Sequence, residues 1–73
     1  MPLAMIRIGE RAKVVSITGT DAVRRHLGSL GFISGVVVSI VQVLNGNMII
    51  GIHDSRIAVG AEVSRRVLVE VVK

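Results

Sequence analysis

The sequence predicts a mainly β domain: a small, strongly bent sheet of about five strands, partly closed into a barrel, with one short inserted helix. Three observations support this prediction. Just over half of the 73 residues are apolar (51%), mainly Val, Ile, Leu and Ala, and such a composition favours strands. Apolar side chains alternate with polar ones in several short segments. Glycines separate these segments at the spacing of tight turns.

The length bounds the organisation of the chain. Residues 1–73 have room for one hydrophobic core and are therefore expected to form a single domain. The longest apolar run has about ten residues, half of what a membrane span requires. No segment resembles a signal peptide. These features predict a cytoplasmic protein that does not insert into a membrane.

The segment ERAKVVSITG is the first expected strand. Ala12, Val14 and Ser16 alternate there with the residues between them, which is the period of a half-buried strand. This pattern predicts that these three side chains share one face of the sheet. Gly19 interrupts the pattern and is expected to end the strand.

A short helix is expected next. Thr20 or Asp21 can cap its first amide groups with a side-chain oxygen. At about 100° per residue, Val23, Leu27 and Leu30 fall on one stripe that faces the core.

Glycine is expected to end this helix. Gly31 can adopt the left-handed conformation of a Schellman motif, and Phe32 then contacts Leu27. The glycines of this stretch therefore close a helix and present its carbonyl end, which repels anions. A phosphate loop requires glycines that open a helix. We therefore expect no GTP or other nucleotide cofactor on this chain.

Strands and turns are expected over the rest of the chain. Asn45-Gly46 is its strongest hairpin motif, because a type I′ turn needs positive φ at both central residues. Gly51 indicates a bulge, a bend or a close backbone approach. The expected elements are a strand over Val36–Leu44, a return strand over 47–54, a turn at Asp54-Ser55, a strand over 56–59, a helical turn over Gly60–Arg66 and a last strand over 67–72.

Four ordered motifs resemble the FeoA family. They are G-E-x-A-x-V-x-x-I (Gly9–Ile17), R-R-x-L-x-x-L-G-F-x-x-G (Arg24–Gly35), S-R-I-A-V (Ser55–Val59) and V-L-V (Val67–Val69), and the resemblance spans about residues 3–72. It implies an SH3-like β-barrel with an inserted helix. It also implies a cytosolic accessory protein that acts beside a membrane ferrous iron transporter with a GTP-binding domain. No catalytic residues are implied.

The sequence departs from the family pattern in two respects. Ile8 and Ser34 stand where many relatives have proline before a glycine. The connection at Asn45-Gly46 is shorter than the loop that relatives often have.

Four residues are the candidate contacts with a partner. Arg24, Arg25 and Ser29 point away from the apolar stripe of the expected helix. Arg56 belongs to the S-R-I-A-V motif, where it is either a partner contact or a brace that donates to turn carbonyls. Together these residues predict a basic surface that recognises an acidic one.

No catalytic, metal-binding or cofactor-binding residue is predicted. The acidic residues form no paired-carboxylate pattern and the chain has no cysteine. His26 is expected at the boundary of the apolar stripe, half-buried, and nothing in the sequence brings it to His53 and Asp54. The methionines Met1, Met5 and Met48 are expected to fill space.

Other functions stay open at this point. The net charge of +4 is compatible with a small basic nucleic-acid-binding barrel, but the chain has no Trp or Tyr to stack on bases. We therefore expect no nucleic-acid partner. A C-terminal SH3-like domain of an iron-dependent repressor is a second alternative, because the resemblance extends to that fold. The high apolar content also leaves self-association into a homo-oligomer open.

Overall fold

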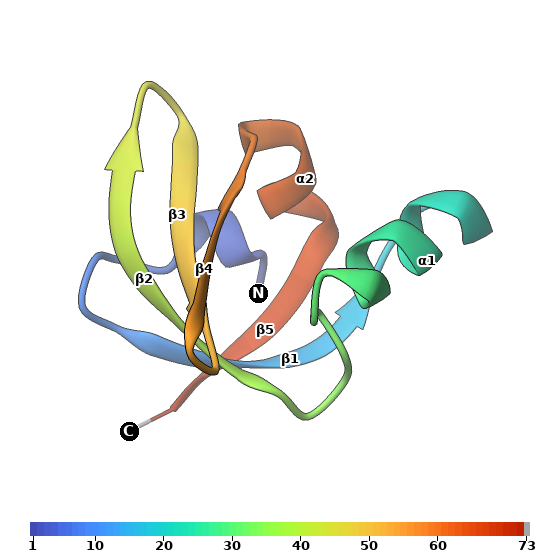
Figure 1. Cartoon of the computed structure of the whole chain (residues 1–73), viewed down its shortest axis with the longest axis horizontal. Coiled ribbons are helices and arrows are strands. Elements are labelled where there is room, and N and C mark those ends of the chain that lie inside the picture. The colour runs from blue at the N-terminus through green and yellow to red at the C-terminus, as the bar shows by residue number, and fades with distance from the viewer. Residues whose placement is uncertain (73) are drawn as a thin grey trace.

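The computed structural model describes residues 1–72. It contains one sheet of five antiparallel strands in the order β4-β3-β2-β1-β5, with two α-helices and one 3-10 helix (Figure 1). The mainly β fold is confirmed. The elements are η1 (Leu3–Met5), β1 (Arg11–Ile17), α1 (Asp21–Ser29), β2 (Val37–Leu44), β3 (Asn47–Ile52), β4 (Ser55–Val59), α2 (Ala61–Arg66) and β5 (Val67–Val72).

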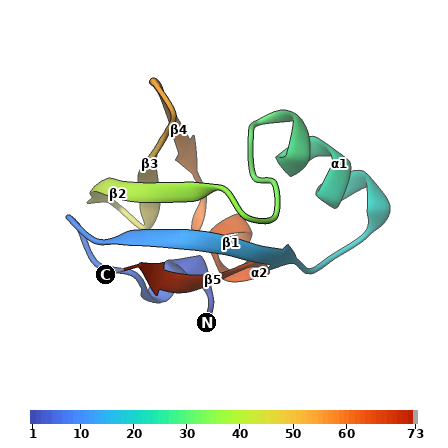
Figure 2. The same ribbon diagram turned by 90° about the horizontal axis from the view of Figure 1, so that it is seen from below.

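The sheet is strongly bent but it is not closed. Figure 2 shows β1, β2 and β5 stacked in one layer, with β3 and β4 rising steeply from it. Within residues 1–72, β4 and β5 pair with no strand beyond their one neighbour each. The expected partial closure into a barrel therefore goes no further than this bend, and the predicted fold class holds. Two sheet edges remain where closure would have left none.

Two irregularities in pairing accompany the bend. The register of β2 against β3 shifts between Ile40 and Gln42, so that Val41 is an extra residue on β2. The register of β1 against β5 shifts between Val14 and Ser16 in the same way. Bulges of this kind bend a strand and increase its twist.

The bulge in β1 corrects the expected facing of its side chains. Ala12 and Val14 are buried as expected, but Ser16 is exposed. Ile17, which the strict alternation placed on the opposite face, packs against the core instead. One extra residue changes the phase of a period-two pattern, so the apolar side chain takes the inward position.

The core lies inside the bend of the sheet. It collects buried side chains from every strand, from η1 and from the end of α1. The Met48, Ile50 and Ile52 side chains of β3 are all buried on one face. Phe32, the single aromatic residue, is buried with them. The buried apolar residues are Leu3, Ile6, Ala12, Val14, Leu27, Phe32, Val38, Ile40, Met48, Ile50, Ile52, Val59, Val67 and Val69.

Two tight turns join β2 to β3 and β3 to β4. Asn45 and Gly46 have φ values of 50° and 82°, which confirms the type I′ turn. The next turn is formed by His53 and Asp54, with His53 at a φ of 53°. The expected strand over 47–54 therefore ends earlier, at Ile52, and the turn lies one residue before its expected place.

The N-terminal segment covers the outer edge of β5. The Val69 amide donates to the Met1 carbonyl at 2.7 Å, and the Met1 amino group donates to the Val69 carbonyl at 2.9 Å. Pro2 forms a bridge with Leu68. Buried Leu3 follows directly and fixes this segment in the core. None of the helices in residues 1–72 has the length and apolar character to cross a membrane.

Candidate partner-binding surfaces

The α1 helix begins and ends at the capping residues that the sequence predicts. The Thr20 hydroxyl accepts a hydrogen bond from the Val23 amide at 3.3 Å, so Thr20 is the cap. At the other end, Phe32 donates to the Leu27 carbonyl at 3.1 Å and Gly31 donates to the Gly28 carbonyl at 3.0 Å. These two bonds form a Schellman motif around Gly31, whose φ is 107°.

The α1 helix stands away from the sheet and is held mainly at its C-terminal end. Figures 1 and 2 both show it projecting beyond β1. Leu27 is its one buried residue, and Leu30 of the expected apolar stripe is 37% exposed. His26 is exposed where a half-buried position was expected, whereas Val23 in the first turn is half-buried against the core.

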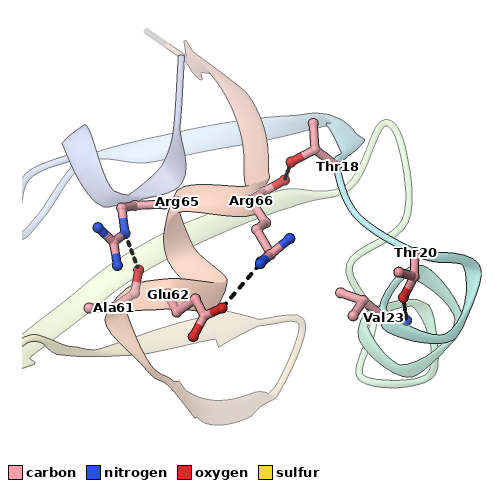
Figure 3. A network of polar contacts seen from close by, with 7 residues as sticks. All are labelled: Thr18, Thr20, Val23, Ala61, Glu62, Arg65 and Arg66. Carbon is pink, nitrogen blue, oxygen red and sulfur yellow. Dashed lines mark hydrogen bonds and ion pairs between the residues drawn. The ribbon is translucent and has the colours of Figure 1, made fainter.

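The α2 helix and the end of β1 fix the place where α1 starts. The Arg66 carbonyl accepts from the Thr18 amide at 2.8 Å and from the Thr18 hydroxyl at 3.2 Å. The Arg66 guanidinium donates to the Glu62 carboxylate at 3.1 Å, so it points along α2 toward α1 (Figure 3). Thr18 is therefore held two residues before the Thr20 cap.

Arg24 and Arg25 lie together on the outer face of α1. Arg24 forms an ion pair with Asp21, and the Arg25 Nε donates to the Asp21 carbonyl at 3.4 Å. The three side chains line an open hollow. The Arg24 side chain is 54% exposed, so the ion pair contributes little to stability. Two arginines against one aspartate leave a positive surface on this helix.

Ser29 lies at the other end of α1. Its hydroxyl donates to the His26 carbonyl at 2.6 Å, within the last turn of the helix. The side chain is exposed and its oxygen keeps a free lone pair. Ser29 therefore helps to end the helix and is accessible to a partner as an acceptor.

Arg56 is exposed on the outer face of β4 and is separate from the arginines of α1. Its register partner on β3 is Gly51. A side chain at Gly51 would bring its Cβ within 2.7 Å of the Ser39 hydroxyl, so the close neighbour at Gly51 is a side chain and not the backbone that was expected. In the part of the chain that the structure describes, the Arg56 side chain takes part in neither ion pair and donates no hydrogen bond, so the brace is not formed.

The end of α1 meets the turn end of the β3–β4 hairpin. A Cβ placed on Gly31 would lie 3.2 Å from the Cγ2 of Ile52, the last residue of β3. Ile52 pairs with Ser55, the neighbour of Arg56. Figure 2 shows α1 and this hairpin on the same side of β1 and β2. The β4 strand, which carries Arg56, therefore lies on the same side of the molecule as the last turn of α1.

A groove that the sequence did not predict lies between η1, the β2–β3 hairpin and α2. It encloses about 310 Å³, and Arg65 lies at its edge with its Nε donating to the Ala61 carbonyl at 3.3 Å (Figure 3). Met5 and Leu44, next to two of its lining residues, are 64% and 51% exposed, so Met5 does not fill space in the core. The lining residues are Ala4, Val43, Gly46, Met48, Ala61, Ser64 and Arg65.

The acidic and histidine side chains are dispersed. Among residues 1–72, no three His, Asp or Glu side chains come together as a metal site would require. His53 and Asp54 lie in the β3–β4 turn, and His26 and Asp21 lie on α1. The surfaces described above can therefore offer charge, apolar contact and backbone groups to a partner.

Several solved structures with the same fold are FeoA proteins. A crystal structure of an iron uptake regulatory protein, FeoA, superposes with a TM-score of 0.91 at 29% identity and covers 99% of this chain and 96% of its own. FeoA from Stenotrophomonas maltophilia, in complex with zinc, has a TM-score of 0.83 at 26% identity and covers 96% of this chain and 89% of its own. It is described as an SH3 domain protein and as a candidate activating factor of bacterial ferrous iron transport.

The solution structure of FeoA from Chlorobium tepidum has a TM-score of 0.91 at 21% identity, covering all of this chain and 71% of its own. At that identity the likeness shows the fold alone. No curated protein sequence matches the chain. The family model of the FeoA domain matches residues 1–71, nearly the whole sequence, and the chain therefore belongs to the FeoA family.

Proposed function

We propose that this protein is a non-catalytic accessory protein of ferrous iron uptake, which binds the cytosolic GTP-binding part of a membrane ferrous iron transporter and changes its activity. The family match over residues 1–71 supports the role in ferrous iron transport. The solved relatives described as an iron uptake regulatory protein and as a transport-activating factor support it further. The proposed place of action is the cytoplasm.

The observation that carries the proposed contact is the projecting α1 helix. Its outer face presents Arg24 and Arg25, which share one acidic neighbour, Asp21. Charged side chains in such a position steer an oppositely charged surface toward the protein. We assign the outer face of α1, namely Arg24, Arg25 and Ser29, to an acidic surface of the transporter, with Arg56 as a second contact.

Regulation by binding requires preference for one state of the partner. A protein that bound both conformations of the transporter equally would shift neither. A tenfold preference for one conformation corresponds to about 1.4 kcal/mol. A few charge-assisted contacts that form in only one conformation are sufficient for such a difference.

Titration against the transporter's isolated cytosolic GTP-binding domain tests the proposal. We expect binding whose affinity differs between the GTP-bound and GDP-bound domain. The double variant Arg24→Glu/Arg25→Glu should bind about tenfold more weakly at physiological salt, and its affinity should depend less on salt concentration. Calorimetry at two salt concentrations measures both effects.

Arg7→Glu/Arg11→Glu is the matched control, because it makes the same change in net charge at exposed residues outside α1. It should keep most of the affinity. Equal losses in the two double variants would assign the effect to net charge and remove α1 as the contact. Absence of binding by the unsubstituted chain in both nucleotide states would contradict the proposed function.

A further inference from the structure

The outer edge of β4 presents unpaired backbone groups. His53 and Asp54 form a two-residue turn, so the flanking pair Ile52 and Ser55 exchanges hydrogen bonds. Antiparallel pairing then alternates, and the amide and carbonyl groups of Arg56 and Ala58 point away from β3. No backbone hydrogen bond found outside the regular elements of residues 1–72 uses these groups.

The side chains of this edge separate into a buried and an exposed row. Val59 is buried and Ile57 is half-buried, whereas Arg56 and Ala58 are exposed. Gly51, opposite Arg56 on β3, places no side chain of its own beside that of Arg56. In the described part of the chain Arg56 has no acidic partner. The same two residues therefore offer backbone donors and acceptors, a small side chain and a free positive charge.

We propose that β4 is the docking edge for an extended acidic segment of the partner, which adds a sixth strand to the sheet. The amide and carbonyl groups of Arg56 and Ala58 would bond the backbone of that segment, and the guanidinium of Arg56 would pair with one of its carboxylates. The inference rests on the proposed function, because it places the segment in the cytosolic part of the transporter.

A second copy of this chain fits the edge less well than an acidic segment does. Two-fold pairing centred on Ile57 would put both Arg56 side chains diagonally opposite on one face, and pairing centred on Arg56 would put them directly opposite. Like charges at these positions repel. A carboxylate at the same place is attracted. In these two registers, charge complementarity therefore favours the acidic segment over a second copy.

The β4 edge lies where one partner domain could contact both this edge and α1. Gly31, directly after α1, lies against Ile52 at the turn end of the β3–β4 hairpin. A strand added to β4 would run along the side of the molecule on which α1 projects (Figure 2). One partner domain can therefore place a strand on β4 and an acidic surface on Arg24 and Arg25.

The decisive comparison is Ala58→Pro against Ala58→Thr. Proline removes the outward amide and is tolerated on a sheet edge, whereas threonine keeps the amide and favours strands. We expect Ala58→Pro to weaken binding of the transporter's cytosolic GTP-binding domain about tenfold and Ala58→Thr to leave it unchanged. Arg56→Ala should also weaken binding, and Arg56→Lys should restore part of it.

Hydrogen exchange of the unsubstituted chain gives a readout that needs no substitution. The amides of Arg56 and Ala58 should exchange rapidly in the free protein, with those of Ile57 and Val59 protected, and should become protected in the complex. Unchanged exchange at Arg56 and Ala58 in the complex would overturn the inference, even if Ala58→Pro did not fold.

Two further outcomes separate this inference from the function on which it rests. If the unsubstituted chain binds the domain and Ala58→Pro binds it equally well, the edge is not the contact and the proposed function stands. If the unsubstituted chain does not bind, both are wrong. A dimer of the free protein that Ala58→Pro dissolves would replace the acidic segment by a second copy.

Discussion

The two edges of the sheet are of similar length but differ in what lies beside them. The outer edge of β5 is paired with Met1 and Pro2, residues almost a full chain length away. The outer edge of β4 has no such cover in residues 1–72. An open sheet exposes two rows of unpaired groups that invite association. In this protein the N-terminal segment forms hydrogen bonds with the β5 edge. The β4 edge carries a single charged residue, Arg56. One edge therefore serves stability and the other is available for recognition.

The largest expected contrast comes from proline at matching positions on the two edges. Val69→Pro removes the amide that donates to Met1 and disturbs a fully buried side chain, so it should lower the free energy of unfolding by about 3–5 kcal/mol. Ala58→Pro removes an amide with no partner in the protein and should cost less than about 1 kcal/mol. Urea unfolding measures both. Similar losses at the two sites would mean that the β4 edge is also structural.

Detachment of the N-terminal cover should have the next largest effect. Leu3 is completely buried, and Leu3→Ala should cost about 2–4 kcal/mol because it leaves a cavity and releases the segment that covers β5. The Val69 amide should then exchange with solvent faster. Met5→Ala in the same short helix is the control and should change stability by less than about 0.5 kcal/mol, since Met5 is exposed. Equal effects would contradict the anchoring role of Leu3.

The smallest change in stability is expected at Arg56 itself. Arg56→Val removes the one charge on the β4 edge and raises its strand propensity. The free energy of unfolding should change by less than about 0.5 kcal/mol, but the protein should associate with itself as its concentration rises. Sedimentation velocity over a range of concentrations measures this association. Arg56→Lys should stay monomeric, and a monomeric Arg56→Val would show that the charge does not guard the edge.

The helix and the first hairpin could be predicted because local chemistry determines them. Thr20, Gly31 and Phe32 form the expected capping bonds at the two ends of α1. Asn45-Gly46 adopts the turn that its positive φ values require. In each case the residues that specify the feature are neighbours in sequence. Short-range patterns of this kind are independent of the way in which the strands later assemble.

Features that depend on assembly could not be predicted. The bulges at Val15 and Val41 reverse the facing of later side chains, and Gly51, which indicated a bulge or a bend, does not locate the extra residue on either strand. His53 has a positive φ, which is uncommon for residues other than glycine. The cover of β5 and the lack of closure follow from contacts between the two ends of the chain.

The same distinction applies to the candidate surfaces. The arginines of α1 were found because helical periodicity places them opposite an apolar stripe. The groove between η1, the β2–β3 hairpin and α2 gathers residues from three separate segments of the chain, so no single motif marks it. The availability of the β4 edge follows from strand order, which the sequence pattern leaves open. The S-R-I-A-V motif indicated a strand at Arg56, but it did not indicate that this strand lies at an open edge of the sheet.

Burial of Phe32 has a practical consequence for the study of this protein. It is the one aromatic residue of a chain without Trp or Tyr, and it lies under the end of α1. The protein is therefore nearly transparent at 280 nm and does not fluoresce when tryptophan is excited. Any tryptophan emission from a mixture belongs to the partner alone. A tryptophan introduced at Ile33, which is 58% exposed beside Phe32, would be the sole fluorophore on this protein.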